Sequence, residues 1–191
     1  MEAFEHVVKS YMESQDYIVS TNVKFPVKMR TRKSAYEEFQ THGYEVDIVA
    51  ARAESLVLGS VKSFLGSHGV NRRGFRRLSA NSGDREYDQY RIFNDPEVRN
   101  GIINGASAQY GYPRQSIEIK LFVGKFKSEQ EQREIEKHVG AMEDCGVRFE
   151  VVGLDKILHG LMEKAKERTY VNDPVIMTLK ALDAAGKLFN G

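Results

Sequence analysis

Two β-rich segments separated by only a few residues constrain the fold of this chain more than any other feature of its sequence. Residues 44–50 alternate polar and apolar side chains before turning apolar, and residues 55–62 form a second β-rich run. The four or five residues between the runs suffice for a turn and are too few for a crossover helix. The sequence therefore predicts an antiparallel hairpin, around which the other elements must be arranged.

The segments on either side of this hairpin are less regular. Apolar residues at helical spacing predict a first helix that ends near residue 14. An extended stretch over residues 17–23 follows, and the polar, basic residues 24–43 are interpreted as a loop or ribbon. After the hairpin, the glycines and arginines of residues 63–83 predict a long exposed loop, and a helix is expected over residues 84–93.

The second half of the chain alternates strands and helices. Asp95-Pro96 and Asp173-Pro174 are each typical of a helix start, with aspartate as the N-cap and proline at the first helical position. Periodicity and capping predict the remaining elements: a strand over residues 117–123, a helix after Ser128, a strand over residues 147–152 and a helix from Leu154. The order α-β-β-β-α-α-β-α-β-α-α predicts an α/β fold with a central mixed sheet flanked by helices.

Length and composition are those of one ordinary globular domain. The chain has 191 residues, of which 41% are apolar and 29% charged, enough for a buried core and a solvated surface. We expect one domain over residues 1–191, with residues 154–191 as a helical C-terminal extension whose last helix is able to serve a homodimer. No apolar run has membrane-spanning length, the N-terminus lacks the order of a signal peptide, and the single cysteine, Cys145, suits a reducing compartment. A cytoplasmic protein without membrane contact is the expectation.

Charge is unevenly distributed along the chain. Residues 24–77 contain eleven Lys and Arg against five Asp and Glu, although the formal net charge of the chain is only +1. Two basic clusters are the expected nucleic-acid-binding residues: Lys24, Lys28, Arg30, Arg32 and Lys33, and then Arg72, Arg73, Arg76 and Arg77. Arginine forks match phosphate oxygens, and Phe75 within the second cluster either stacks on an exposed base or packs into the protein. DNA, contacted through its phosphate backbone, is the expected partner, with an ordinary solvated surface as the alternative.

The hairpin carries the residues with the clearest chemistry. Side chains alternate along a strand, so Glu45 and Asp47 are expected on one face of the first strand, and Ser60 and Lys62 on one face of the second. A register that brings Asp47 close to Lys62 creates a carboxylate beside a lysine. The carboxylate holds Mg²⁺ or Mn²⁺, the cation activates water toward a phosphodiester, and the lysine neutralises developing charge. The second basic cluster follows closely in sequence and is expected at the rim of this site. The apolar residues expected to support the site from the opposite face are Val46, Ile48, Val57 and Val61.

The hairpin sequence also resembles the core of a known superfamily. The matching segments are Gly43 to Ala50 (Gly-Tyr-Glu-Val-Asp-Ile-Val-Ala) and Leu56 to Lys62 (Leu-Val-Leu-Gly-Ser-Val-Lys), which resemble the PD-(D/E)XK nucleases, especially the resolvase-like and Mrr-like branches. The resemblance implies a restriction-endonuclease-like core and metal-dependent cleavage of DNA. It implies that Asp47 is the principal metal ligand, that Lys62 is the catalytic lysine, and that Glu5 on the first helix orients the site through the water shell of the metal.

The chain departs from the superfamily pattern at Ser60, where an acidic residue is usual. A hydroxyl is a poorer ligand for Mg²⁺ than a carboxylate, so a second carboxylate has to come from elsewhere. Glu45 is the nearest substitute and a predicted metal ligand, and Glu86 or Asp88 of the following helix are others. That helix contains Asp88-Gln89-Tyr90-Arg91, which is faintly similar to a Gln-and-Tyr helical motif of related nucleases.

Three functions follow from these patterns. The leading expectation is a Mg²⁺- or Mn²⁺-dependent endodeoxyribonuclease. The second is a catalytically inactive, nucleic-acid-binding member of the same fold that lost the acid at position 60. The third is an α/β interaction domain without nucleic acid, in which Asp47 and Lys62 form a plain strand-end salt bridge.

Overall fold

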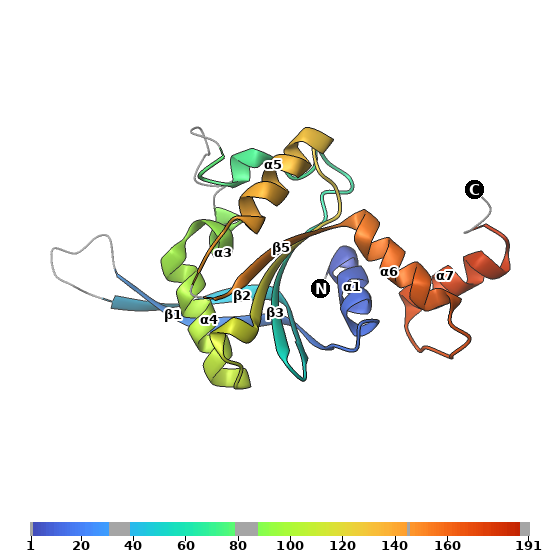
Figure 1. The fold of residues 1–191 in the computed structure, drawn as a ribbon, viewed down its shortest axis with the longest axis horizontal. Coiled ribbons are helices and arrows are strands. Elements are labelled where there is room, and N and C mark those ends of the chain that lie inside the picture. Colours follow the sequence, from blue (N-terminus) through green and yellow to red (C-terminus); the bar gives the residue numbers. More distant parts are fainter. Residues whose placement is uncertain (1, 31–38, 79–87, 145, 188–191) are drawn as a thin grey trace.

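A five-stranded mixed sheet runs through the middle of the molecule (Figure 1). The computed structural model describes residues 2–30, 39–78, 88–144 and 146–187. The strands, in their order across the sheet, are β1 (Ile18–Arg30), β2 (Phe39–Arg52), β3 (Ser55–Lys62), β4 (Ile117–Val123) and β5 (Arg148–Gly153). Strands β2 and β3 are antiparallel and form the predicted hairpin, and β1 pairs with β2 as a further antiparallel strand. Strands β3, β4 and β5 are parallel to one another.

Helices cover both faces of the sheet and give the molecule three layers (Figure 1). The helices are α1 (Ala3–Glu13), α3 (Arg91–Asn94), α4 (Pro96–Tyr110), α5 (Glu129–Gly140), α6 (Leu154–Lys166) and α7 (Pro174–Ala184), with short 3-10 turns at Arg72–Gly74 and Arg114–Ser116. Helices α3, α4 and α5 contribute to the buried cluster on one face, and α1, α6 and α7 to the cluster on the other. The prediction of an α/β fold with a central mixed sheet flanked by helices is confirmed.

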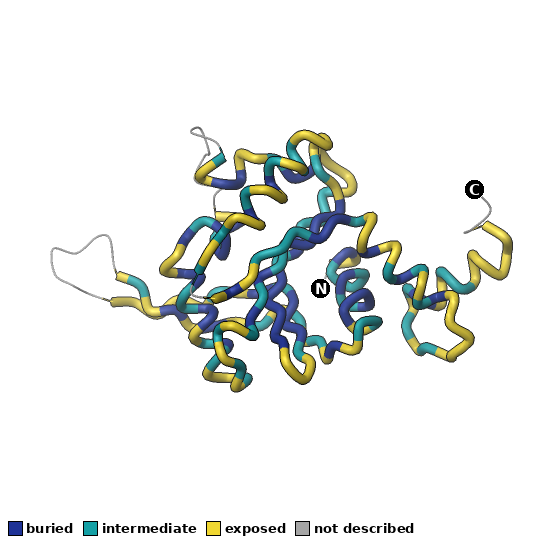
Figure 2. The backbone as a smooth tube through the Cα atoms, in the orientation of Figure 1, coloured by how far each residue is buried: buried dark blue, intermediate teal, exposed yellow. Residues whose placement is uncertain are grey.

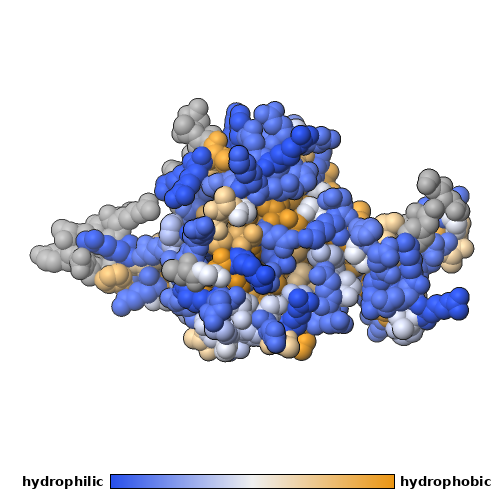
Figure 3. All heavy atoms as spheres, in the orientation of Figure 1, coloured by the Kyte–Doolittle hydropathy of each residue, from blue (hydrophilic) through white to orange (hydrophobic). Residues whose placement is uncertain are grey.

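Buried residues, most of them apolar, concentrate along the sheet and on the helix segments packed against it, and the buried segments are dark blue in Figure 2. Ile119 and Leu121 of β4 are fully buried under α4 and α5, and Ile157 and Leu161 of α6 are fully buried beside α1. Each such side chain contributes about 1.5–3 kcal/mol by leaving water. The face shown in Figure 3 is largely hydrophilic over α5 and α6, with apolar atoms gathered at its centre. Within the described ranges, no helix is both long and apolar enough to cross a membrane.

Helix α4 lies close to β1 because two of its residues lack side chains. A Cβ added to Gly101 would lie 2.4 Å from Cγ1 of Val27, and one added to Gly105 would lie 3.2 Å from the ring of Phe25. The helix begins as the sequence predicts, since Asp95 accepts hydrogen bonds from the backbone N–H groups of the first turn. This packing holds the outer strand against the helical layer.

Strands β1 and β2 are longer than their apolar segments. Residues 24–30 and 39–43, which the sequence assigns to a loop or ribbon, form paired ends of these strands, with Arg30 opposite Phe39. The pair extends beyond the helices as a two-stranded ribbon (Figure 1). Residues 24–30 alternate exposed side chains with Phe25, Val27 and Met29, which is a strand pattern. Residues 39–43 of β2 are exposed on both faces and lack this alternation, so their pairing is not visible in the sequence.

The segment after β3 is less exposed than its composition predicts. Val70 and Phe75 are buried, and Val70 forms a parallel bridge with Phe126. The expectation of an exposed loop is therefore wrong for these residues, because single apolar side chains in a polar segment reach the core without any periodicity. Of the helix expected over residues 84–93, the described residues contain the short helix α3, and residues 84–87 lie outside the described part.

Candidate active site

The candidate site lies where β2 and β3 separate. The antiparallel ladder between these strands begins one residue after Asp47, and β3 continues through Lys62 paired with β4. Oδ2 of Asp47 accepts hydrogen bonds from the backbone N–H of Val61 at 2.6 Å and from Oγ of Ser60 at 3.4 Å. The carboxylate thus satisfies a backbone donor that a strand partner would otherwise satisfy. It is held directly against the strand that carries Lys62.

The regular alternation of β2 breaks at Asp47. Val46 and Val49, three residues apart, belong to the buried cluster on the α4 side, whereas Ile48 belongs to the cluster on the α1 side. Residues three apart do not share a face of a regular strand. Asn22, between the β1 residues paired with Val46 and Ile48, has a left-handed backbone (φ 55°), which asparagine tolerates. The expectation that four apolar residues support the site from one face is therefore wrong for Val46.

Lys62 reaches the same space from β3. Its side chain is half-buried, and Nζ lies 5.8 Å from the ring centroid of Tyr90, a buried residue just before α3. The Tyr90 ring in turn lies 4.8 Å, centroid to centroid, from the buried ring of Phe75. A cation over an aromatic face is attracted by the ring quadrupole. Aromatic packing therefore positions the ammonium group.

Two adjoining cavities meet at Asp47 and Lys62. One has a volume of about 230 Å³ and lies toward Tyr44 and α4. The other, of about 430 Å³, lies toward the start of α1. Gln89 joins Asp47 and Lys62 in lining both of them. Each residue predicted to take part in catalysis or metal binding lines at least one of the two cavities: Asp47, Lys62, Glu45 and Ser60 the smaller, and Asp47, Lys62 and Glu5 the larger.

Glu45 and Glu5 line the cavities but already have partners. Oε1 of Glu45 accepts a hydrogen bond from Nδ2 of Asn22 at 3.2 Å, and its Oε2 lies 3.8 Å from Nζ of Lys24. Oε2 of Glu5 accepts a hydrogen bond from the backbone N–H of Glu2 at 3.0 Å and so closes the capping box of α1. Both carboxylates therefore have structural roles that metal binding would compete with.

The two cavities offer a divalent cation few protein ligands. Across the described ranges, no group of three or more His, Cys, Asp or Glu side chains is arranged to hold a metal ion. Mg²⁺ keeps several waters and is commonly bound through one or two carboxylates, of which Asp47 supplies one. The Ser60 hydroxyl stands where a second was expected. Asp88 lines the smaller cavity, with Oδ1 3.6 Å from Nε of Arg91, and Glu86 lies outside the described residues.

Gln89, Tyr90 and Arg91 belong to the site, although the sequence indicates them only through a short Gln-and-Tyr similarity. Gln89 lines both cavities and Tyr90 contacts Lys62. The Arg91 guanidinium lies 5.1 Å from the ring centroid of Tyr44. Burial raises the pKa of Tyr44, and the positive charge of Arg91 opposes that rise. Periodicity misses these residues because contacts between separate elements leave no local pattern in the sequence.

The first basic cluster lies along the exposed side of the β1–β2 ribbon. Nζ of Lys28 lies 4.9 Å from the ring centroid of Phe39 on the neighbouring strand. Lys28 and Arg30 are exposed and two residues apart, so they share a face of β1. Arg32 and Lys33 lie outside the described residues. The described part of this cluster therefore forms one basic edge on the ribbon.

The second basic cluster does not form one surface. The backbone N–H of Arg72 donates to Oε2 of Glu131 at 2.6 Å, and its Nη1 lies 3.1 Å from Oε2 of Glu134. Hydrogen bonds from Gln130 and Arg72 lower the pKa of Glu134. Arg72 is therefore tied to the acidic side chains of α5.

The other three arginines diverge from Arg72. Arg73 is exposed, whereas Arg76 and Arg77 line a separate cavity. Among the described residues that line the two cavities at the candidate site, none belongs to this cluster. The expectation that the cluster forms the rim of the site is not met. Phe75 is buried, so of the two alternatives for this ring, packing into the protein is the one observed.

Comparisons with known proteins add little to this geometry. No family model matches the sequence, and no curated protein matches it. Among solved structures, the crystal structure of AF1548, described as a protein of unknown function, is similar at 18% sequence identity and a TM-score of 0.40, covering 97% of this chain and 78% of that chain. A likeness at this level carries no argument about function.

Proposed function

We propose that this chain is a divergent PD-(D/E)XK protein with a restriction-endonuclease-like core, which hydrolyses phosphodiester bonds in DNA with Mg²⁺ or Mn²⁺. One observation carries the proposal. Asp47 and Lys62 line common cavities at the point where β2 and β3 separate, and the Asp47 carboxylate is bonded to the strand that carries the lysine. A carboxylate for a hard cation and an ammonium group beside it are the groups that this reaction requires.

The residues of the chain have distinct parts in this proposal. Asp47 would hold the cation with the carboxylate oxygen that Val61 leaves available, and the Ser60 hydroxyl is a weak additional ligand. A bound cation polarises the phosphate and lowers the pKa of its water. Lys62 orients the attacking water or neutralises charge that develops on the phosphate, and its contact with Tyr90 keeps the ammonium group in place.

The partner in this proposal is the phosphate backbone of DNA, contacted by the exposed Lys28 and Arg30 of the ribbon. A cytoplasmic location belongs to the same proposal and is supported by the single cysteine. A homodimer through the C-terminal helix is compatible with the exposed Met177 and Leu182 of α7.

A plasmid-nicking assay tests the proposal. The unmodified protein is expected to nick supercoiled DNA in the presence of Mn²⁺ or Mg²⁺, and nicking is expected to stop when the metal is chelated. Asp47→Asn removes the carboxylate charge with little change in shape and is expected to abolish nicking. Asp183→Asn makes the same change on the exposed end of α7 and serves as the matched control. Nicking that survives Asp47→Asn would overturn the assignment.

A specific observation favours a second candidate, a nucleic-acid-binding protein of the same fold without catalysis. Ser60 occupies the position expected to supply a carboxylate, and the other acids at the cavities are engaged elsewhere. Salt-dependent DNA retention without nicking at any Mn²⁺ concentration would select this candidate. An absence of both retention and nicking would leave the α/β interaction domain.

A further inference from the structure

A separate cavity of about 570 Å³ lies between residues 76–77, the start of α4 and the end of α5. Among the described residues, none lines both this cavity and either of the two cavities at Asp47 and Lys62. Among the described residues that line the separate cavity, the ionisable ones are Arg76, Arg77, Arg99, His138 and Glu143. Within this described lining, positive side chains outnumber negative ones around an open space of ligand size.

The backbone that presents Arg76 and Arg77 is held in place. The N–H of Arg76 donates to Oδ1 of Asn94 at 3.1 Å, and Nδ2 of Asn94 donates to the carbonyl of Gly74 at 2.7 Å. Between these two contacts, the buried Phe75 ring lies 5.9 Å from the ring of His138, centroid to centroid, in an edge-on arrangement. The hydrogen bonds of Asn94 and the burial of Phe75 thus fix the main-chain positions of Arg76 and Arg77.

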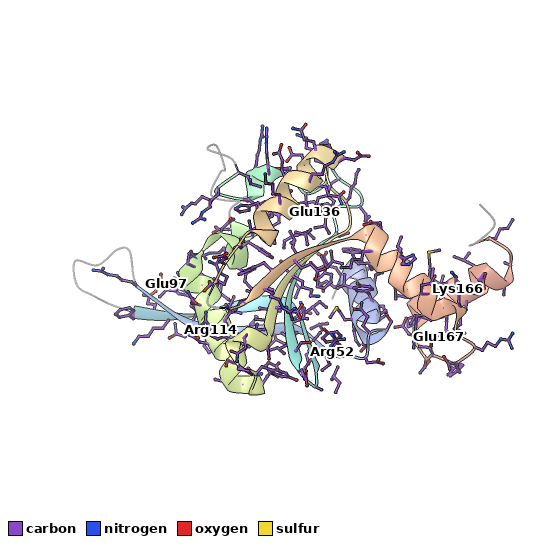
Figure 4. All side chains as sticks on the ribbon, in the orientation of Figure 1. Arg52, Glu97, Arg114, Glu136, Lys166 and Glu167 are labelled. Atoms are coloured by element: carbon purple, nitrogen blue, oxygen red, sulfur yellow. The ribbon has the colours of Figure 1, made fainter. Side chains whose placement is uncertain are left out.

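The charge of Arg99 is already matched inside the protein. Its Nε lies 2.7 Å from Oδ2 of Asp144, and its Nη1 donates to the carbonyl groups of Ile92 and Phe93. Oδ1 of Asp144 also accepts a hydrogen bond from Nη2 of Arg114 at 3.4 Å. Figure 4 labels Arg114 beside α4. Arg99 therefore forms a rigid wall of the cavity, and its guanidinium group is already occupied within the protein.

Arg77 supplies charge that the described residues do not neutralise. It makes no hydrogen bond or ion pair within the described ranges, and it is close enough to His138 to influence its ionisation. Burial, and then the positive charge of Arg77, lower the pKa of His138. The imidazole is consequently neutral at neutral pH and offers a ring N–H donor without adding a competing cation.

Apolar side chains complete the cavity. Phe93, Pro96 and Met142 line it beside the polar groups. A bare inorganic anion needs no apolar wall, whereas a phosphate ester has an anionic end for arginine forks and a carbon-bearing end for apolar contact. From this combination we infer that the cavity binds the phosphate of a nucleotide, either free or within a DNA strand, through Arg77 with His138 as a further donor.

Calorimetric titration of the full-length protein at low salt tests this inference with two ligands, adenosine monophosphate and a short DNA duplex. Arg77→Gln is expected to weaken binding of the recognised ligand by about tenfold or more, because it removes a charge-assisted hydrogen bond. Arg133→Gln removes the same charge from the exposed face of neighbouring α5 and is expected to leave affinity nearly unchanged. Circular dichroism melting curves confirm that both variants are folded.

The two ligands distinguish the two sources of phosphate. Tight binding of adenosine monophosphate that Arg77→Gln weakens identifies a free-nucleotide site, and an effect confined to the duplex identifies a contact to a DNA strand. The inference is overturned if the unmodified protein binds neither ligand, or if Arg133→Gln weakens binding as much as Arg77→Gln. The readout is binding, so it is independent of whether the Asp47 site cleaves DNA.

Discussion

The β2–β3 hairpin and the arginine segment at residues 72–77 were both expected to face DNA at one site, and they behave differently in the folded chain. In the hairpin, Asp47 and Lys62 line common cavities, as their spacing on paired strands predicts. In the arginine segment, Arg72 contacts Glu134 of α5, Arg73 is exposed, and Arg76 and Arg77 line a separate cavity. The difference teaches that spacing predicts proximity where a hydrogen-bonded ladder fixes the register, and fails where a single buried ring decides the path of the chain.

The largest expected effect is on the nicking rate, which should depend on the hairpin and not on the arginine segment. Lys62→Ala should lower the rate of metal-dependent nicking by about 100-fold or more, because it removes a preorganised charge next to the reacting phosphate. Arg72→Ala removes a positive charge of the other region, whose guanidinium is occupied by Glu134, and should change the rate little. Initial rates on supercoiled plasmid measure both. Equal losses in the two variants would show that general positive charge, and not position, governs the reaction.

The next effect concerns stability and tests whether the arginine segment is part of the core. Phe75→Ala should lower the free energy of unfolding by about 3–5 kcal/mol, since it deletes a fully buried ring that contacts Tyr90 and His138. Phe39→Ala on the ribbon, where the residue is 52% exposed, is the matched control and should cost far less. Urea denaturation followed by circular dichroism measures the difference. Similar values for the two variants would mean that the segment is not anchored by this ring.

A smaller effect is expected where the hairpin departs from its superfamily pattern. Ser60→Glu adds a carboxylate beside Asp47 and should tighten Mn²⁺ binding by about tenfold, or roughly 1.4 kcal/mol. Without metal the same variant should be less stable, because the two carboxylates repel. Ser67→Glu in the exposed loop after β3 is the control. Unchanged Mn²⁺ affinity in titration calorimetry would place position 60 away from any metal site.

The smallest expected effect is the pH dependence that His138 gives to stability. Its pKa lies below the ordinary value of 6.5, so below about pH 6.5 the unfolded chain binds more protons than the folded chain. Stability should therefore fall as the pH is lowered from this value through the folded-state pKa. His138→Gln should flatten that part of the profile of urea midpoint against pH. A parallel profile for the variant and the unmodified protein would contradict the assignment.

Local signals in the sequence predict most of the fold. The hairpin follows from a short connection between two β-rich runs, and the starts of α4 and α7 follow from Asp95 and Asp173, which cap them as expected. The order of helices and strands agrees with the prediction for the same reason. Each of these features depends on hydrogen bonds or side-chain periodicity within a few residues along the chain, which the sequence displays directly.

Tertiary packing alone decided the rest of the candidate site. Tyr90 reaches Lys62, and Arg76 and Arg77 turn toward His138, because Phe75 is buried between α3 and α5. No local pattern marks these contacts, since the partners are far apart in the sequence and meet only when the core closes. The sequence by itself thus determined the elements and the closeness of Asp47 and Lys62 beyond the end of the β2–β3 ladder, whereas the surroundings of these two residues depend on which apolar side chains the whole chain is able to bury.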